Sequence, residues 1–128
     1  MALRDLVSRS DELDEAAIEE VVKDFVRYDP EKRQILFVPE SGRLSHRQKI
    51  LVYLTAFRGW RYLLPPEEAP FESSPAEIEA ETHIVGGSLR PTLRTMMEEG
   101  WLTNNEGRYS IPAYNIPRVK EYLDPLPF

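Results

Sequence analysis

Apolar residues recur at helical spacing near the start of the chain. At intervals of four they form one face of a helix predicted over 11–28, namely Leu13, Ala17, Val21 and Phe25. Acidic residues crowd its first turn, where the helix dipole favours negative charge. Pro30 then marks a turn, and the apolar run at 34–38 predicts a short strand. The alternative interpretation is a hairpin over 25–37 about this turn.

The next predicted element is a helix over 46–64. Ser45 and Gln48 match the capping-box pattern at its start, and two prolines at 65–66 stop it. Apolar residues cover nearly its whole circumference, which is typical of a buried helix, so we expect it at the centre of the core. Its aromatic residues are then core residues, with cofactor stacking as the alternative for Tyr53, Phe57, Trp60 and Tyr62. A stripe of arginines on one side is a candidate patch for an anionic partner and consists of Arg47, Arg58 and Arg61.

Residues 74–112 have the most informative pattern. Ser74 suits the N-cap of a helix over 75–82, with proline at N1 and Glu77 at N3 to close a capping box. A glycine-bearing turn over 84–87 leads into a helix over 88–99, whose inward face holds Leu89, Leu93, Met96 and Met97. Gly100 ends that helix. Residues 101–112 then read as a hairpin with a polar turn at 104–107, and a last short helix is predicted over about 116–123.

This order of a short helix, a tight turn, a longer helix and a hairpin resembles the winged helix–turn–helix superfamily. The stretch SPAEIEAETHIVGGSLRPTLRTMMEEGWLTNNEGRYSIP is similar to the second helix, turn, third helix and wing of prokaryotic winged-helix regulators. The likeness rests on Ser74-Pro75, on the glycine turn before Ser88, and on the EEGWL segment that leads into the wing. It extends back to residue 34 if the helix at 46–64 is the family's first helix and 34–38 its first strand.

The resemblance implies a fold that is mainly α with a small β-hairpin wing. This is a winged helix–turn–helix of the α+β class with an extra N-terminal helix. The expected organisation is an acidic helical extension over 1–30 and a winged-helix domain over 31–128.

The resemblance also implies which residues meet DNA. In such proteins the third helix enters the major groove and the wing touches the adjacent backbone. By position, the contacts come from the outer face of helix 88–99 and from the wing at 103–108, and the candidates are Ser88, Arg90, Pro91, Thr92, Arg94, Thr95, Asn104, Asn105 and Arg108. Arg94 is the first candidate for a base contact, because a guanidinium can bind guanine bidentately. Pro91 falls in the first turn of the helix predicted from Ser88, where its missing N–H has no intrahelical partner. The alternative for each residue is an ordinary solvated helix face or hairpin turn.

Charge is distributed unevenly along the 128 residues. The formal net charge is −6, which by itself argues against a general electrostatic nucleic-acid binder and against a polybasic membrane-surface protein. Residues 1–30 carry −5, residues 31–64 carry +5 and residues 65–86 carry −6, whereas residues 87–112 are neutral. The presumed DNA-contacting helix and wing therefore lie outside the acidic segments, although the helix at 75–82 has three glutamates and no basic residue.

Several kinds of chemistry find no support in the sequence. Without cysteine there is no disulfide, thiolate metal site or cysteine nucleophile. His46 and His83 have no metal-ligand spacing, and Gly86-Gly87-Ser88 lacks the lysine of a phosphate-binding loop. We therefore expect no metal, no cofactor and no enzyme activity.

The leading hypothesis is a DNA-binding transcriptional regulator that acts as a homodimer. The alternative is a winged-helix protein–protein interaction module within a multi-subunit complex. A small-molecule-sensing regulator, the third possibility, would need a pocket near Trp60 and Tyr62. No apolar stretch is long enough to span a bilayer and the first twenty residues lack the apolar core of a secretion signal, so we expect a cytoplasmic protein without a membrane partner.

Overall fold

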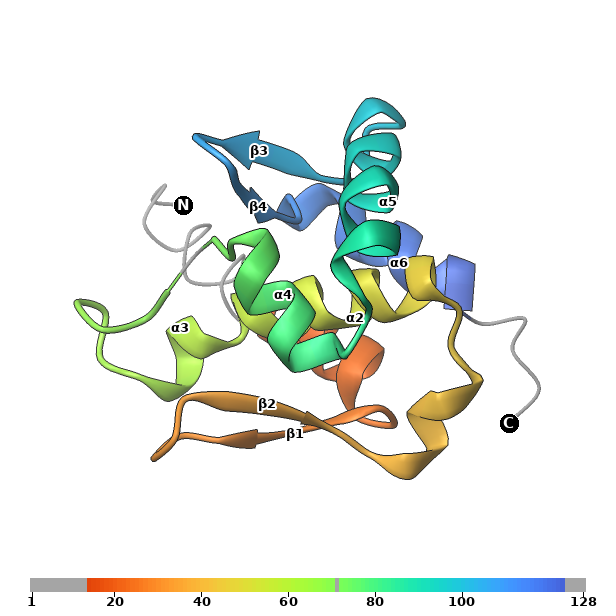
Figure 1. Cartoon of the computed structure of the whole chain (residues 1–128). Coiled ribbons are helices and arrows are strands. Elements are labelled where there is room, and N and C mark those ends of the chain that lie inside the picture. The colour runs from red at the N-terminus through yellow and green to blue at the C-terminus, as the bar shows by residue number, and fades with distance from the viewer. Residues whose placement is uncertain (1–13, 71, 124–128) are drawn as a thin grey trace, which may run out of the picture.

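The computed structural model describes residues 14–70 and 72–123, and confirms the mainly helical α+β class (Figure 1). Residues 14–22 are helical. The further elements are, in chain order, β1 (Val26–Asp29), β2 (Gln34–Phe37), the 3-10 turn η1 (Pro39–Arg43), α2 (His46–Arg58), α3 (Trp60–Leu63), α4 (Pro75–Thr82), α5 (Gly86–Glu98), β3 (Thr103–Asn105), β4 (Arg108–Ser110), the 3-10 turn η2 (Ala113–Asn115) and α6 (Ile116–Leu123). Buried apolar residues from the helices and from both hairpins form one hydrophobic cluster.

The first predicted helix is shorter than its pattern indicates. Helical structure ends at residue 22, and 26–29 form a strand that pairs antiparallel with β2, with Val26 opposite Phe37. The hairpin alternative is therefore correct and the helix over 11–28 is wrong at its C-terminal end; its first three residues lie outside the described part of the chain. β-branched and aromatic side chains favour the strand, and the Asp29 carboxylate accepts the Lys32 N–H at 3.1 Å to close the turn. The expected division at residue 30 falls inside this hairpin.

Helix α2 is the central helix, as its pattern predicts. Ser45 and Gln48 form the predicted capping box. All side chains from Ile50 to Arg58 are buried, and so is that of Trp60. The predicted single helix over 46–64 is divided, however, because α2 ends at Arg58 and α3 begins at Trp60. The Gly59 N–H bonds to the Ala56 carbonyl three residues back at 2.8 Å, which tightens the chain at this point.

The second half of the chain packs on α2. Both α4 and α5 contact α2, and α6 contacts it as well (Figure 1). The bounds of α4 and α6 match the predicted 75–82 and 116–123, and α4 begins with the predicted capping box between Ser74 and Glu77. Among the helices of the described ranges, none is long and apolar enough to cross a membrane.

The segment that joins the β3–β4 hairpin is not the predicted one. Residues 34–37 pair with β1 in a separate sheet, so the segment expected to be the family's first strand does not join the β3–β4 hairpin. Instead Ser73, two residues before α4, forms an isolated antiparallel bridge with Tyr109 on β4. Two backbone hydrogen bonds of 2.8 Å join these residues. A proline- and glutamate-rich connector brings Ser73 to this edge, and no local hydrophobic pattern marks so short a strand.

Helix α5 begins at Gly86, two residues before its predicted start at Ser88. Its N-cap is Val85, which offers no side-chain oxygen to the first amides. Pro91 is consequently the sixth residue of the helix rather than part of its first turn, and it has no N–H to donate to the carbonyl of Gly87. The backbone N–H groups of Ser88 and Leu89 both bond to the Val85 carbonyl, which fixes the earlier start.

The two helix starts predict different responses to the loss of a serine. Ser45→Ala removes the hydroxyl that accepts the Gln48 N–H, so we expect a loss of about 1 kcal/mol in the free energy of unfolding. Ser88→Ala places a better helix former inside the first turn of α5, so we expect no loss. Denaturant unfolding of both variants measures the difference. Equal destabilisation by the two changes would contradict the observed start of α5.

Candidate nucleic-acid interface

Helices α4 and α5 are joined by a turn of three residues. His83 adopts a left-handed conformation, with φ of 62°, and ends α4. Ile84 is buried, and Val85 is the N-cap of α5. The Thr82 hydroxyl donates to the Ile78 carbonyl at 2.6 Å and accepts the N–H of Ile84 at 3.4 Å, so the end of α4 and the turn are held together. The two helices pack against each other as a compact pair on α2.

Helix α5 has a buried face and an exposed face, as predicted. Leu89, Leu93 and Met96 are completely buried. Five of the six candidate contact residues on this helix are exposed, and these are Ser88, Arg90, Pro91, Arg94 and Thr95. Thr92 is partly buried, with its hydroxyl donating to the Ser88 carbonyl at 2.8 Å. The structure thus brings the candidates of α5 together on one solvent-facing surface.

The two arginines of that surface differ in their surroundings. The Arg94 Nε lies 3.4 Å from a carboxylate oxygen of Glu98 one turn later, and 79% of the Arg94 side chain is exposed. A pair so exposed contributes little to stability, and its arginine can change partner readily. Arg90 makes no ion pair among the described residues and borders a surface hollow of about 360 Å³ with His83, Val85 and Glu79.

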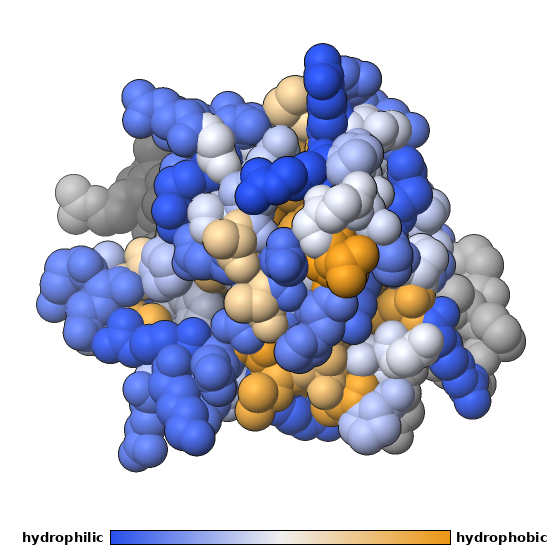
Figure 2. Space-filling view, viewed as in Figure 1, coloured by the Kyte–Doolittle hydropathy of each residue, from blue (hydrophilic) through white to orange (hydrophobic). Residues whose placement is uncertain are grey.

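The face that carries α5 is mixed in character. Figure 2 shows hydrophilic side chains over α5 and the β3–β4 hairpin, and hydrophobic ones near the middle of the view and along the lower edge, where the β1–β2 hairpin lies. Val85 in the α4–α5 turn is 67% exposed and Leu36 on β2 is 47% exposed.

The hairpin presents the three predicted wing residues differently. Asn104 and Asn105 lie in β3, and the turn itself consists of Glu106 and Gly107, both with positive φ. This is the two-residue turn geometry in which such φ values are required. The Asn104 side-chain oxygen accepts the Gly107 N–H at 2.9 Å, so this residue shapes the turn, whereas Asn105 is exposed beside the tip.

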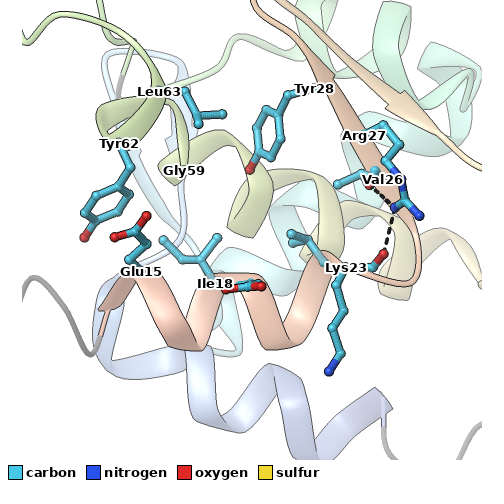
Figure 3. A pocket seen from close by; sticks show the side chains of 11 residues that line it. Glu15, Ile18, Lys23, Val26, Arg27, Tyr28, Gly59, Tyr62 and Leu63 are labelled. Carbon is cyan, nitrogen blue, oxygen red and sulfur yellow. Dashed lines mark hydrogen bonds between the residues drawn. The ribbon is translucent and has the colours of Figure 1, made fainter.

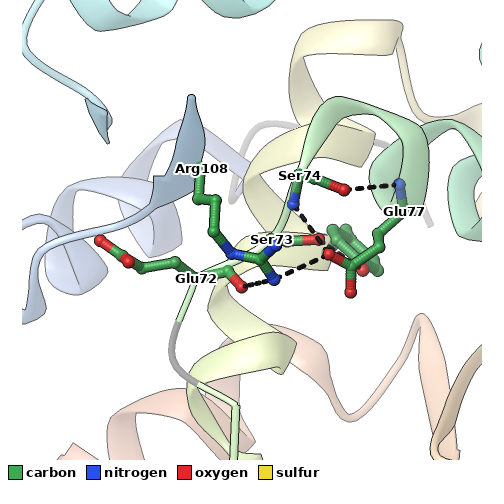
Figure 4. A network of polar contacts seen from close by, with 6 residues as sticks. Glu72, Ser73, Ser74, Glu77 and Arg108 are labelled. Carbon is green, nitrogen blue, oxygen red and sulfur yellow. Dashed lines mark hydrogen bonds and ion pairs between the residues drawn. The ribbon is translucent and has the colours of Figure 1, made fainter. Parts of the chain in front are cut away.

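Arg108 flanks the turn, yet its side chain folds back towards α4 (Figure 4). Its Nη2 donates to the Glu72 carbonyl at 2.9 Å and to the Glu77 carboxylate at 2.8 Å. The same carboxylate accepts the Ser74 N–H at 3.1 Å in the capping box. The sequence identified Glu77 only as a capping residue, because nothing local connects it with an arginine 31 positions later.

The acidic character of α4 is divided between two sides of the helix. Glu77 and Glu79 are exposed, whereas Glu81 is half-buried where α4 meets β2. Burial raises the pKa of the Glu81 carboxyl, and a hydrogen bond from the backbone of Ile35 partly opposes this change. Two of the three predicted acidic side chains of α4 therefore remain in solvent.

The structure does not gather the three arginines of the predicted cationic stripe. Arg47 forms an ion pair with Glu99, and hydrogen bonding to that carboxylate raises the pKa of Arg47. Arg58 lies at the opposite end of α2, is buried, and donates to the Ile111 carbonyl at 3.1 Å. Arg61 belongs to α3 and lines a hollow of about 240 Å³ together with Arg58. Arg47 is therefore the arginine that lies apart, at the other end of α2 from Arg58.

A largely apolar hollow of about 270 Å³ lies between helix 14–22, β1 and α3 (Figure 3). It has Tyr62 and Leu63 in its lining, so a cavity exists beside one of the two aromatic residues that a small-molecule sensor would use. Trp60 is 1% exposed and takes no part in this lining. Tyr53, Phe57 and Trp60 are buried core residues, as predicted.

The described residues contain no group of three or more histidine, aspartate or glutamate side chains that could hold a metal ion. Apart from Thr92, the candidate residues of α5 are exposed to solvent, as is Asn105 beside the hairpin turn. Comparison with family models, with curated proteins and with solved structures finds no match for this chain.

Proposed function

We propose that this chain is a winged-helix DNA-binding protein, a transcriptional regulator that contacts double-stranded DNA through α5 and the tip of the β3–β4 hairpin. The observation that carries the proposal is the two-faced character of α5. Leu89, Leu93 and Met96 on its inner face are completely buried and Met97 is partly buried, while Arg90 and Arg94 are exposed on the outer face. A helix held in this way can enter the major groove without disturbing its packing.

The order of elements supports the same proposal. After α2 and the short α3, the Ser73 bridge, α4, α5 and the β3–β4 hairpin follow one another along the chain. The hairpin lies beside α5 (Figure 1). Asn105 at its tip is exposed and offers a donor and an acceptor to the adjacent DNA backbone.

The charge of this surface predicts weak binding with a shallow salt dependence. Two exposed arginines that each neutralise one phosphate give a slope of about −1.8 for log K against log salt per chain. A homodimer would double this value and would place two α5 helices on half-sites about one helical turn apart. Sedimentation of the protein with and without DNA measures the stoichiometry.

The test is DNA binding by fluorescence anisotropy at several salt concentrations. We expect salt-sensitive binding by the wild-type protein, and a slope that becomes less negative by about 1 in both Arg90→Gln and Arg94→Gln. Arg33→Gln is the matched control, because it removes the same charge from the β1–β2 turn, where Arg33 pairs with Glu68. Absence of binding at low salt, or an equal effect of the control, would refute the proposal.

A second candidate function is a protein–protein interaction module within a multi-subunit complex. It is favoured by the ion pairs of Arg94 with Glu98 and of Arg108 with Glu77, which reduce the positive charge available for phosphates. The exposed Val85 lies on the same surface. Under this proposal a stoichiometric protein partner is recovered from nuclease-treated lysate, and a Val85→Asp variant fails to recover it.

A further inference from the structure

Glu77 engages the one arginine of the hairpin tip. Arg108 pairs with Asn105 across the hairpin and directly flanks the turn, so its backbone lies at the tip. Its guanidinium nevertheless lies against the first turn of α4, 2.8 Å from the Glu77 carboxylate (Figure 4). The exposed fractions of the two side chains are 46% and 45%, so solvent and ligands reach both partners.

A carboxylate and a phosphate are equivalent acceptors for a guanidinium. Both offer oxygens that accept parallel N–H groups, and both bring a negative charge. We propose, on the basis of the proposed function, that Glu77 competes with DNA for Arg108. In the free protein the Glu77 carboxylate accepts the hydrogen bond from Arg108 that a backbone phosphate accepts in the complex. Binding then requires the Arg108–Glu77 pair to exchange for an Arg108–phosphate pair.

The surroundings of the pair allow this exchange without loss of the fold. Arg108 keeps its bond to the Glu72 carbonyl at 2.9 Å, and the bridge between Ser73 and Tyr109 holds β4 in place independently of either side chain. The capping box also survives a change of charge, because glutamine can take the place of glutamate at N3. The pair is therefore separable from the structure that carries it.

The experiment compares two glutamates of the same helix by anisotropy with duplex DNA. In Glu77→Gln we expect affinity to rise roughly two- to fivefold, which corresponds to the usual strength of an exposed ion pair. We also expect the salt slope to steepen by about 0.9, because Arg108 gains a phosphate contact. Glu79→Gln removes the same charge from the next exposed position of α4 and leaves the slope unchanged.

Two further variants distinguish the effect of the Arg108–Glu77 ion pair from the effect of a general change in surface charge. Glu77→Asp keeps the charge but shortens the side chain by one methylene, so it also steepens the slope. Arg108→Gln in the Glu77→Gln background abolishes both gains. Far-ultraviolet circular dichroism shows whether each variant is folded, and Glu77→Asp serves as the test if Glu77→Gln is not.

The outcomes distinguish this inference from the function on which it rests. If wild-type protein does not bind DNA at low salt, the proposed function falls and the competitor role with it. If wild-type protein binds DNA but Glu77→Gln matches Glu79→Gln in affinity and slope, the competitor role alone is overturned.

Discussion

Replacing Gly59 by alanine is expected to lower the free energy of unfolding by about 3 kcal/mol. A Cβ atom at this position would lie 2.4 Å from the Tyr28 hydroxyl and 2.9 Å from the backbone carbonyl of Ala56. The carbonyl belongs to the last turn of α2 and cannot swing aside. The tyrosine is restricted as well, because its ring packs edge-on against Trp60 with the centroids 5.0 Å apart.

The cause of this sensitivity is a contact between two distant parts of the chain. The Tyr28 hydroxyl donates to the Ala56 carbonyl at 2.5 Å and so reaches across the place where a side chain at residue 59 would begin (Figure 3). The requirement for glycine at residue 59 is steric and not conformational, because any residue can adopt its φ of −68°. The break between α2 and α3 thus accommodates a residue from β1.

Gly87→Ala is the matched control, since a Cβ there meets nothing within 4 Å and the residue lies in the first turn of α5. We expect the control to be neutral or more stable than the wild type by up to about 1 kcal/mol. Tyr28→Phe should recover part of the stability lost in Gly59→Ala, because the closest contact disappears with the hydroxyl. Urea unfolding of the single and double variants measures these effects, and a wild-type midpoint for Gly59→Ala would exclude the described packing.

Alkaline unfolding is the second large expected effect. Burial raises the pKa of Tyr28 and of Tyr53 well above the ordinary value of 10.0. In the unfolded chain both phenols ionise near their ordinary pKa, so above this pH the unfolded state binds fewer protons than the folded state. The stability that these groups contribute is therefore complete below pH 10 and declines above it by about 1.4 kcal/mol per pH unit for each tyrosine.

The measurement is the free energy of unfolding in urea at a series of pH values from about 8, where neither phenol affects the slope, to about 12, where both do. Tyr53→Phe and Tyr28→Phe should each reduce the slope above pH 10 by about one half of the combined effect. Tyr114→Phe is the control, because this side chain is 75% exposed. A slope that is the same in wild type and in the Tyr28→Phe, Tyr53→Phe double variant would show that other groups govern alkaline unfolding.

The elements that could be predicted from the sequence are those with local signals. A few neighbouring residues determine each of these signals, which are the capping boxes at Ser45 and Ser74 and the periodic apolar face of α5. The structure contains a helix at each of the three places. The helix over 11–28 is wrong at its C-terminal end because Phe25 and Val26 continue a helical apolar pattern, whereas the strand at 26–29 depends on pairing with β2, where Val26 lies opposite Phe37. Periodicity cannot choose between a helix and a hairpin when both bury the same side chains.

The residues of the candidate surface also differ in whether local sequence signals predict their positions. The exposure of Arg90 and Arg94 follows from the spacing of Leu89, Leu93 and Met96, so the sequence placed it correctly. The position of the Arg108 side chain depends on a carboxylate 31 residues earlier, and the role of Ser73 as a strand depends on Tyr109. Such contacts depend on the tertiary arrangement of α4, α5 and the hairpin on α2, and the local spacing of residues in the sequence does not predict them.

The bridge between Ser73 and Tyr109 also determines how this part of the molecule is connected to the remainder. Two hydrogen bonds of 2.8 Å join Ser73, two residues before α4, to Tyr109 near the end of the β3–β4 hairpin. The intervening chain, with α4, α5 and the hairpin turn, is thus a closed loop whose entry and exit coincide. The surface proposed to meet DNA therefore lies on a length of chain that is closed by this bridge and packs on α2, and Tyr53 of α2 contacts the bridge through its 3.1 Å hydrogen bond with Ser73.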